Sequence, residues 1–208
     1  MKTLTSLTFA AIAFTAAAFG QNPITADSAF QISYASNLVA GDSYVDLSNT
    51  GASSAVAFPT QDGNICVNVY TYDPSEELVS CCACKVTPNG LASLSVKQDL
   101  VSNTLTPGVP GSIVIKLLAT STLAGGTCNP ASPTATNLVG GMRAWATSLH
   151  QNTSTGAFEI TENAFANSVL SASELAKLTT YCGFIQANGS GFGICRSCRL
   201  GGLGGAQQ

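Results

Sequence analysis

The chain has 208 residues, and its formal net charge is −3 at pH 7. Lys and Arg together number only 8, which leaves no basic patch to neutralise phosphates, so nucleic acid is not an expected partner. Charged residues make up 9% of the chain and hydrophobic residues 45%, a composition that supports a buried core and disfavours a disordered linker. The length corresponds to one domain.

The first 20 residues have the pattern of a secretory signal peptide. Lys2 supplies a positive charge, residues 4–19 are mostly apolar and uncharged, and Ala18–Gly20 places small residues where a signal peptidase cleaves. The apolar stretch is shorter than the roughly 20 residues that a membrane-spanning helix needs. We therefore expect residues 1–20 to be removed, leaving a secreted, extracellular or periplasmic protein with no membrane span.

Short strands are expected in the first part of the mature chain. Some segments alternate apolar and polar residues, and another is rich in β-branched and aromatic residues; both patterns are typical of strands. The turn at 88–90 is expected to close a hairpin, and residues 92–106 fit neither strand nor helix periodicity well. The predicted strands are residues 30–34, 44–48, 65–72 and 77–86.

The second part of the chain contains three more predicted strands and one long loop. Residues 112–119 are expected to form a buried strand, and the Gly-, Pro-, Ser- and Thr-rich residues 121–137 a loop held by a disulfide. Residues 142–149 alternate, so that Trp145 lies on one face with Leu149. Residues 157–161 are the last predicted strand.

One helix is well signalled. Ser171 and Glu174 form a capping box, in which each side chain binds a free backbone N–H of the first turn. Apolar residues recur at helical spacing from Leu175 to Cys182, and Gly183 is expected to end the helix.

About seven short strands and one late helix predict a mainly β fold. We expect an antiparallel β-sandwich over residues 21–199, followed by a flexible Gly-rich tail over residues 200–208. A parallel α/β fold is disfavoured because helices do not alternate with the strands.

Eight cysteines follow the predicted signal peptide. In an exported chain an even number of cysteines predicts disulfides, here four, whose pairing the spacing alone does not determine. Neighbouring residues of a strand point to opposite faces, so Cys81 and Cys82 should bond to partners on different sides, while Cys82 and Cys84 share a face. The disulfide candidates are Cys66, Cys81, Cys82, Cys84, Cys128, Cys182, Cys195 and Cys198.

Two alternative roles for the cysteines stay open. The motifs Cys82-Ala-Cys84 and Cys195-Arg-Ser-Cys198 could supply four thiolates to zinc. The second motif also has the C-x-x-C spacing of thiol–disulfide oxidoreductases, although it lies between glycines and not at the start of a helix that follows a strand. The Cys81-Cys82 doublet resembles that of hydrophobins, but that family needs a second doublet, which this chain lacks. We assign the chain to no family.

Three further groups of residues are candidates for a site. Asp73, Glu76 and Glu77 form the densest acidic group, which could serve a hydrolase as a carboxylate pair. His150 is the single histidine, and no serine motif of a hydrolase accompanies it. Aromatic residues could form a binding platform, in particular Tyr70, Tyr72 and Trp145.

The leading interpretation is a secreted protein that works by binding or assembly and not by catalysis, with no cofactor. Its expected partner is a cell surface, a carbohydrate or a second copy of the chain. The alternatives are an extracellular hydrolase that uses the carboxylates, and a metal-binding or redox protein that uses cysteine thiolates.

Overall fold

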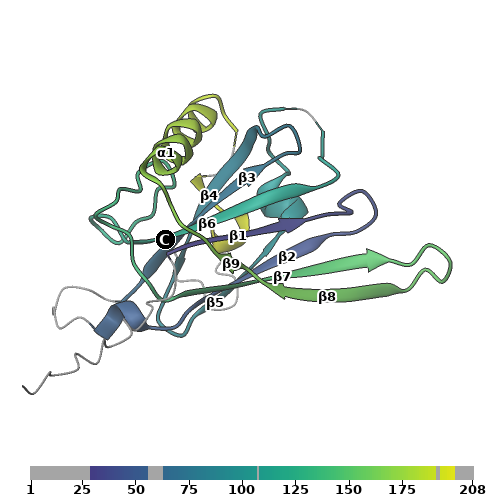
Figure 1. Cartoon of the computed structure of the whole chain (residues 1–208), viewed down its shortest axis with the longest axis horizontal. Coiled ribbons are helices and arrows are strands. Elements are labelled where there is room, and N and C mark those ends of the chain that lie inside the picture. The colour runs from purple at the N-terminus through teal and green to yellow at the C-terminus, as the bar shows by residue number, and fades with distance from the viewer. Residues whose placement is uncertain (1–28, 56–62, 107, 191–192, 200–208) are drawn as a thin grey trace, which may run out of the picture.

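In the computed structural model, the described residues are 29–55, 63–106, 108–190 and 193–199. The predicted signal peptide (1–20) and the predicted tail (200–208) lie outside them. The described residues form two sheets packed face to face, as Figure 1 shows. No helix among them is long and apolar enough to cross a membrane.

The larger sheet has six strands, and all neighbours except β10 and β4 are antiparallel. Their spatial order is β10 (Gly193–Ile194), β4 (Leu78–Val86), β3 (Ile65–Tyr72), β6 (Ile113–Ser121), β1 (Phe30–Ala35) and β9 (Ala166–Asn167). The smaller sheet is antiparallel throughout, in the order β5 (Leu91–Ser95), β2 (Ser43–Asn49), β7 (Met142–Gln151) and β8 (Phe158–Ala164).

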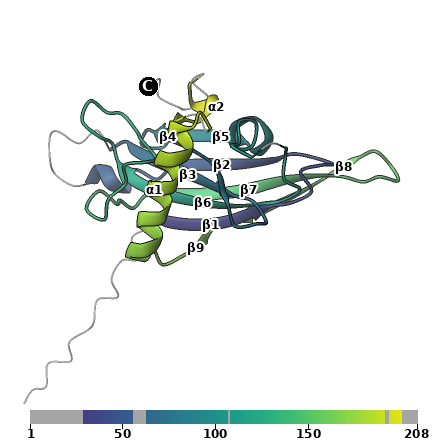
Figure 2. The same cartoon turned by 90° about the horizontal axis from the view of Figure 1, so that it is seen from above.

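Four helical segments accompany the sheets. They are the α-helices α1 (Ala172–Ala187) and α2 (Arg196–Arg199), the 3₁₀ turn η1 (Ala52–Ala55) and the π-helical turn η2 (Val96–Leu100). The α1 helix lies across strands of the six-stranded sheet (Figure 2). It begins as predicted, because the side chain of Ser171 accepts a hydrogen bond from the Glu174 backbone N–H.

The predicted fold class is confirmed: the chain is mainly β, with two packed sheets, a C-terminal helix and four disulfides. Each of the seven predicted strands corresponds to one of the strands β1–β4 and β6–β8. The segment that fits neither period divides into the short strand β5 and the π-helical turn η2, which explains why no single period describes it.

Two local predictions are wrong. The turn at 88–90 does not close a hairpin, because β4 and β5 belong to different sheets and the chain crosses between them there. Gly183 does not end α1, which continues for another turn to Ala187, with Gly189 in the left-handed conformation (φ +80°) beyond it. A side chain at Gly183 would contact Ala131, so this glycine lies where the helix meets a loop.

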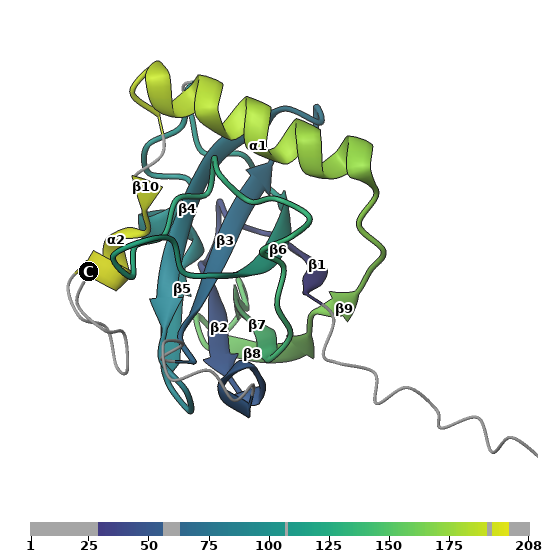
Figure 3. The same ribbon diagram turned by 90° about the vertical axis from the view of Figure 1, so that its left-hand side faces the viewer.

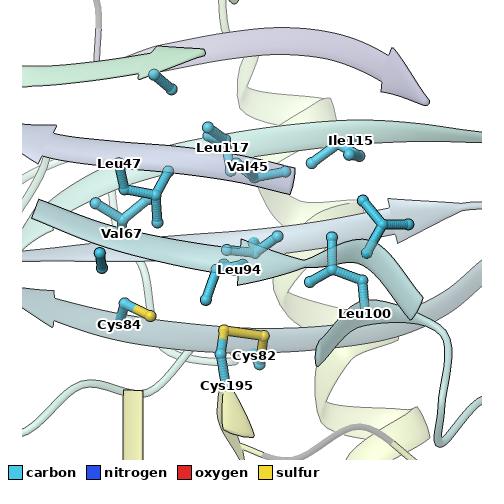
Figure 4. Close-up of a cluster of buried hydrophobic side chains, with 14 of the residues drawn as sticks. Val45, Leu47, Val67, Cys82, Cys84, Leu94, Leu100, Ile115, Leu117 and Cys195 are labelled. Carbon is cyan, nitrogen blue, oxygen red and sulfur yellow. A yellow bond between two sulfur atoms is a disulfide. The ribbon is translucent and has the colours of Figure 1, made fainter. Parts of the chain in front are cut away.

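Apolar side chains fill the space between the sheets. Figure 4 shows Val45, Leu47 and Leu94 of the smaller sheet facing Val67 and Leu117 of the larger one. A second apolar cluster lies under α1 on the opposite face of the six-stranded sheet and contains Phe30, Tyr70, Cys81, Leu118, Leu178, Cys182 and Ile185. Where α1 lies over it (Figure 3), the six-stranded sheet is therefore buried on both faces.

A buried carboxylate joins the C-terminal segment to this core. Asp99 of η2 is 1% exposed, and its oxygens accept hydrogen bonds from the backbone N–H of Ser197 (2.6 Å), the hydroxyl of Ser197 (2.7 Å) and the backbone N–H of Ser95 (2.9 Å). Three donors compensate for the loss of water around a buried carboxylate. Asp99 thus holds α2 against the turn that follows β5.

We predict that Asp99→Asn lowers the free energy of unfolding by about 1–3 kcal/mol. Asparagine replaces one carboxylate oxygen, which accepts a hydrogen bond, by an NH₂ group, which would then face another donor. Urea unfolding of the oxidised protein measures the effect. Glu76→Gln is the matched control, since Glu76 is exposed and the substitution should change stability very little. Equal stability of Asp99→Asn and wild type would contradict the role given to Asp99.

Candidate functional site

All eight cysteines are paired. The four disulfides are Cys66–Cys128, Cys81–Cys182, Cys82–Cys195 and Cys84–Cys198. Such a set is consistent with a protein that folds in an oxidising compartment, extracellular or periplasmic.

Strand β4 supplies three of the eight sulfurs and sends them to two sides. Cys81 points outward and bonds to Cys182 of α1, whereas Cys82 and Cys84 point toward the other sheet and bond to the C-terminal segment. The alternation predicted from the sequence, including the tie between the helix and the sheet, is therefore confirmed. The remaining bond joins Cys66 of β3 to Cys128 in the 121–137 loop, as expected for a loop that needs anchoring.

The redox interpretation of the C-x-x-C motif is wrong, because Cys195 and Cys198 do not bond to each other and each reaches across to β4. The four cysteines of the proposed zinc site do gather in one place, but as two disulfides and not as thiolates. Disulfide sulfurs are not available as the thiolate ligands that zinc requires. Among the described residues no cluster of His, Cys, Asp or Glu has the geometry of a metal site.

The aromatic candidates separate onto different surfaces. Tyr70 is fully buried under α1, and its hydroxyl donates to the carbonyl oxygen of Pro130 (2.7 Å), so it belongs to the core and not to a binding platform. Burial raises the pKa of Tyr70. Tyr72, two residues along the same strand, is half-buried at the edge of α1, and Trp145 lies on the other sheet.

Tyr72 lies in an open hollow of ≈ 390 Å³ between the end of β3, β6 and α1. The ammonium of Lys116 lies 4.5 Å from the centre of the Tyr72 ring and 2.6 Å from Oε1 of Glu174. These contacts are a cation–π interaction and an ion pair that tie α1 to the sheet. Burial, helped by the negative charge of Glu174 and by Tyr181, raises the pKa of Tyr72 to about 12.

The acidic group is only partly assembled at this hollow. Asp73 and Glu76 line it, together with Lys177 and Tyr181 of α1, but Glu77 does not. Oδ1 of Asp73 accepts the backbone N–H groups of Ser75 (2.9 Å) and Glu77 (3.0 Å), so this carboxylate forms the turn between β3 and β4. The observed role of Asp73 is therefore structural.

His150 lies near the projecting end of β7. Its Nδ1 is 2.9 Å from the amide nitrogen of Asn37, and its Nε2 is 3.1 Å from the hydroxyl of Thr161. Both contacts join neighbouring segments of the fold. His150 therefore joins the end of β7 to its neighbouring segments.

Trp145 lies on the outer face of the four-stranded sheet. Its neighbours Ala144 and Ala146 point into the core, so Trp145 points away from it, as do Thr147 and Leu149. Tyr44 of β2 pairs with Thr147, and Ile160 of β8 pairs with Leu149, which places both on this same face. We name the set Tyr44, Trp145, Leu149, Phe158 and Ile160 the outer apolar band.

The outer apolar band is open to solvent. Phe158 is 58% exposed and Ile160 68%, and every residue of β8 is exposed. By contrast, α1 covers much of the outer face of the six-stranded sheet, although Tyr34 and Val114 at one end of that face are exposed. A group of exposed apolar side chains on a bare sheet face is a feature of interaction surfaces.

Comparison with known proteins gives no family. No protein-family model matches the chain, and no curated protein matches it. Among solved structures, one described as "Crystal Structure of Thermotoga maritima 1070" superposes with a TM-score of 0.43 and 8% identity, covering 70% of this chain and 98% of that chain. A likeness at this level carries no functional argument.

Sequence reasoning missed several residues of these surfaces. Lys116 and Glu174 are far apart in the chain, so no local pattern signals their ion pair. Phe158 and Ile160 alternate with polar residues, which predicted their strand, but the pattern alone does not show that their face is bare.

We predict that stability falls as the pH rises from about 10 toward 12, because the folded protein holds the proton of Tyr72 more tightly than the unfolded chain does. Tyr72→Phe has no phenol to ionise at this position, so its stability relative to wild type should increase over the same pH range. Urea unfolding at several alkaline pH values measures the difference. A constant difference from pH 9 to pH 12 would contradict the raised pKa of Tyr72.

Proposed function

We propose that the protein is an extracellular, non-catalytic binding module whose ligand lies on the outer apolar band. The observation that carries the proposal is the bare outer face of the four-stranded sheet, with the single tryptophan of the chain beside Tyr44 and Leu149. Trp and Tyr are over-represented at binding surfaces because each combines a large apolar ring with a polar group.

The ligand class that fits this face is a neutral carbohydrate polymer. Its apolar C–H faces would lie on the aromatic rings, and its hydroxyls would meet polar side chains such as Thr147 and Asp46, which are themselves joined by a hydrogen bond of 3.1 Å. Strand pairing brings only Asp46, Arg143 and Glu162 as charged residues to this part of the face. A weakly charged surface favours a neutral ligand over a polyanion.

The disulfides support the same setting. Each disulfide contributes about 2–4 kcal/mol to the folded state, largely by restricting the unfolded chain. Four of them would keep a small sandwich folded outside the cell without a partner or a metal. The binding face would then be preorganised, which reduces the entropic cost of capturing a ligand.

The hydrolase alternative has less support. The carboxylate of Asp73 is occupied by backbone donors of its own turn, and Glu77 lies outside the hollow that Asp73 and Glu76 share. A glycosidase needs two carboxyl groups on either side of one bond. The observed contacts show no such pair of carboxyl groups, because the carboxylate of Asp73 is held within the turn.

Trp145 provides a direct test, because it is the only tryptophan and its emission reports on this face alone. We expect soluble β-glucan, cello-oligosaccharides or chito-oligosaccharides to change its fluorescence in a saturable way. Trp145→Ala, followed by calorimetry, should weaken the binding about tenfold or more, as truncation of a central aromatic contact does.

The control is Tyr72→Ala, which alters an aromatic residue on the other sheet and should leave the affinity unchanged. The proposal fails if none of these polymers binds the wild-type protein. It also fails if Trp145→Ala binds as tightly as wild type.

A further inference from the structure

The sheet edges of this fold are not equally protected. In the six-stranded sheet the end strands β9 and β10 have two residues each, so they offer little backbone of their own to another strand. In the four-stranded sheet the end strand β5 is contacted by η2 and α2. Strand β8, at the other end, has seven residues, all exposed.

The sequence of β8 contains neither proline nor lysine to block pairing with another strand. Natural proteins protect long edges with proline, charged side chains (lysine above all), bulges or a covering segment. The strand reads Phe-Glu-Ile-Thr-Glu-Asn-Ala, with no proline or lysine, and its pairing with β7 runs without a register shift. Its two acidic residues are its only charges.

The hydrogen bonds to β7 show which backbone groups of β8 are unused within the sheet. The Asn152 N–H donates to the carbonyl of Ala157, and the Phe165 N–H donates to the carbonyl of Ala144. Hydrogen-bonded pairs alternate along an antiparallel ladder, so residues 159, 161 and 163 direct their backbone toward β7. Residues 158, 160, 162 and 164 direct their N–H and C=O groups toward the free edge.

The part of β8 nearest the turn also lacks support from a third strand. Pairing between β2 and β7 ends at Ser43 and Ser148, whereas β7 and β8 continue to the pair Gln151 and Phe158. Figure 1 shows the resulting hairpin extending past the other strands. A two-stranded ribbon is marginally stable by itself, so an added strand would stabilise it.

We propose that β8 is a self-association edge, at which a second copy of the chain adds its own β8 in antiparallel orientation. In the register centred on Thr161, each residue whose backbone faces the free edge lies opposite such a residue of the other copy. Phe158 lies opposite Ala164, and Ile160 lies opposite Glu162. All the unused N–H and C=O groups of both strands are then paired. The two four-stranded sheets become one continuous sheet.

The charges of β8 are compatible with this register. Glu159 lies opposite Asn163 of the second copy, and Glu162 lies opposite Ile160, so no carboxylate directly faces another. Only the two Glu162 residues are diagonal neighbours across the two-fold axis, which is a weaker repulsion than a direct pair. Phe158, exposed in the single chain, lies opposite Ala164, and the two Ile160 residues are diagonal neighbours, so both gain apolar contact at the seam.

The association does not depend on the carbohydrate ligand proposed above. It places two outer apolar bands side by side on one extended face. A repetitive polymer could then contact both copies at once, which raises the effective affinity without any new contact within one copy.

Proline at position 160 gives a selective test, because the Ile160 N–H faces the free edge and β7 does not use it. Sedimentation velocity of wild type from micromolar to near-millimolar concentration should show a monomer–dimer equilibrium. Ile160→Pro should weaken dimerisation about tenfold or more, since symmetry removes two hydrogen bonds. Ile160→Ala keeps the N–H and is the matched control; it should weaken dimerisation less.

A strictly monomeric wild type at the highest concentration would overturn the proposal, as would equal dimerisation of wild type and Ile160→Pro. Trp145 emission checks that the hairpin of the proline variant is folded. Hydrogen exchange of the wild type alone provides a second measurement, because the amides of Ile160 and Glu162 should become protected as concentration rises. Exchange of these amides that does not depend on concentration would equally contradict the dimer.

Discussion

The three cysteines of β4 are the constraint on which the rest of the structure depends. Because Cys81 and Cys82 are adjacent in an extended strand, their sulfurs leave the sheet in opposite directions. One attaches α1 to the outer face, and the other, with Cys84, attaches the C-terminal segment at the inner side. The middle layer of the molecule is thereby cross-linked to α1 on one side and to the C-terminal segment on the other.

This cross-linking explains why the two outer faces differ. The disulfide to Cys182 and the ion pair between Lys116 and Glu174 keep α1 on the six-stranded sheet, whose covered part becomes a buried central layer. Within the described part of the chain no corresponding element covers the four-stranded sheet, so Trp145 and its neighbours stay at the surface. The proposed binding face and the proposed self-association edge both belong to this uncovered sheet. In the proposed dimer the binding face would continue across the paired β8 strands from one copy to the other.

Local patterns predicted most of the elements because alternation, turn residues and caps act over a few positions. They placed Cys81 and Cys82 on opposite faces and the start of α1 at Ser171, and the structure has both. They failed where a distant contact decides the outcome. Residues 88–90 cross between sheets and Tyr70 lies beneath α1, and both results depend on which layers pack together, which short-range periodicity does not encode.

The most direct test of this account is the disulfide connectivity of the purified, unreduced protein, determined by mass spectrometry of peptides with stepwise reduction and alkylation. The account predicts no free thiol before reduction, with Cys81 bonded to Cys182 of the helix and Cys82 bonded to Cys195 of the C-terminal segment. Exchanged partners for these two neighbours, or free thiols among Cys82, Cys84, Cys195 and Cys198, would contradict it. The disulfides would then not explain why one sheet is covered and the other is bare.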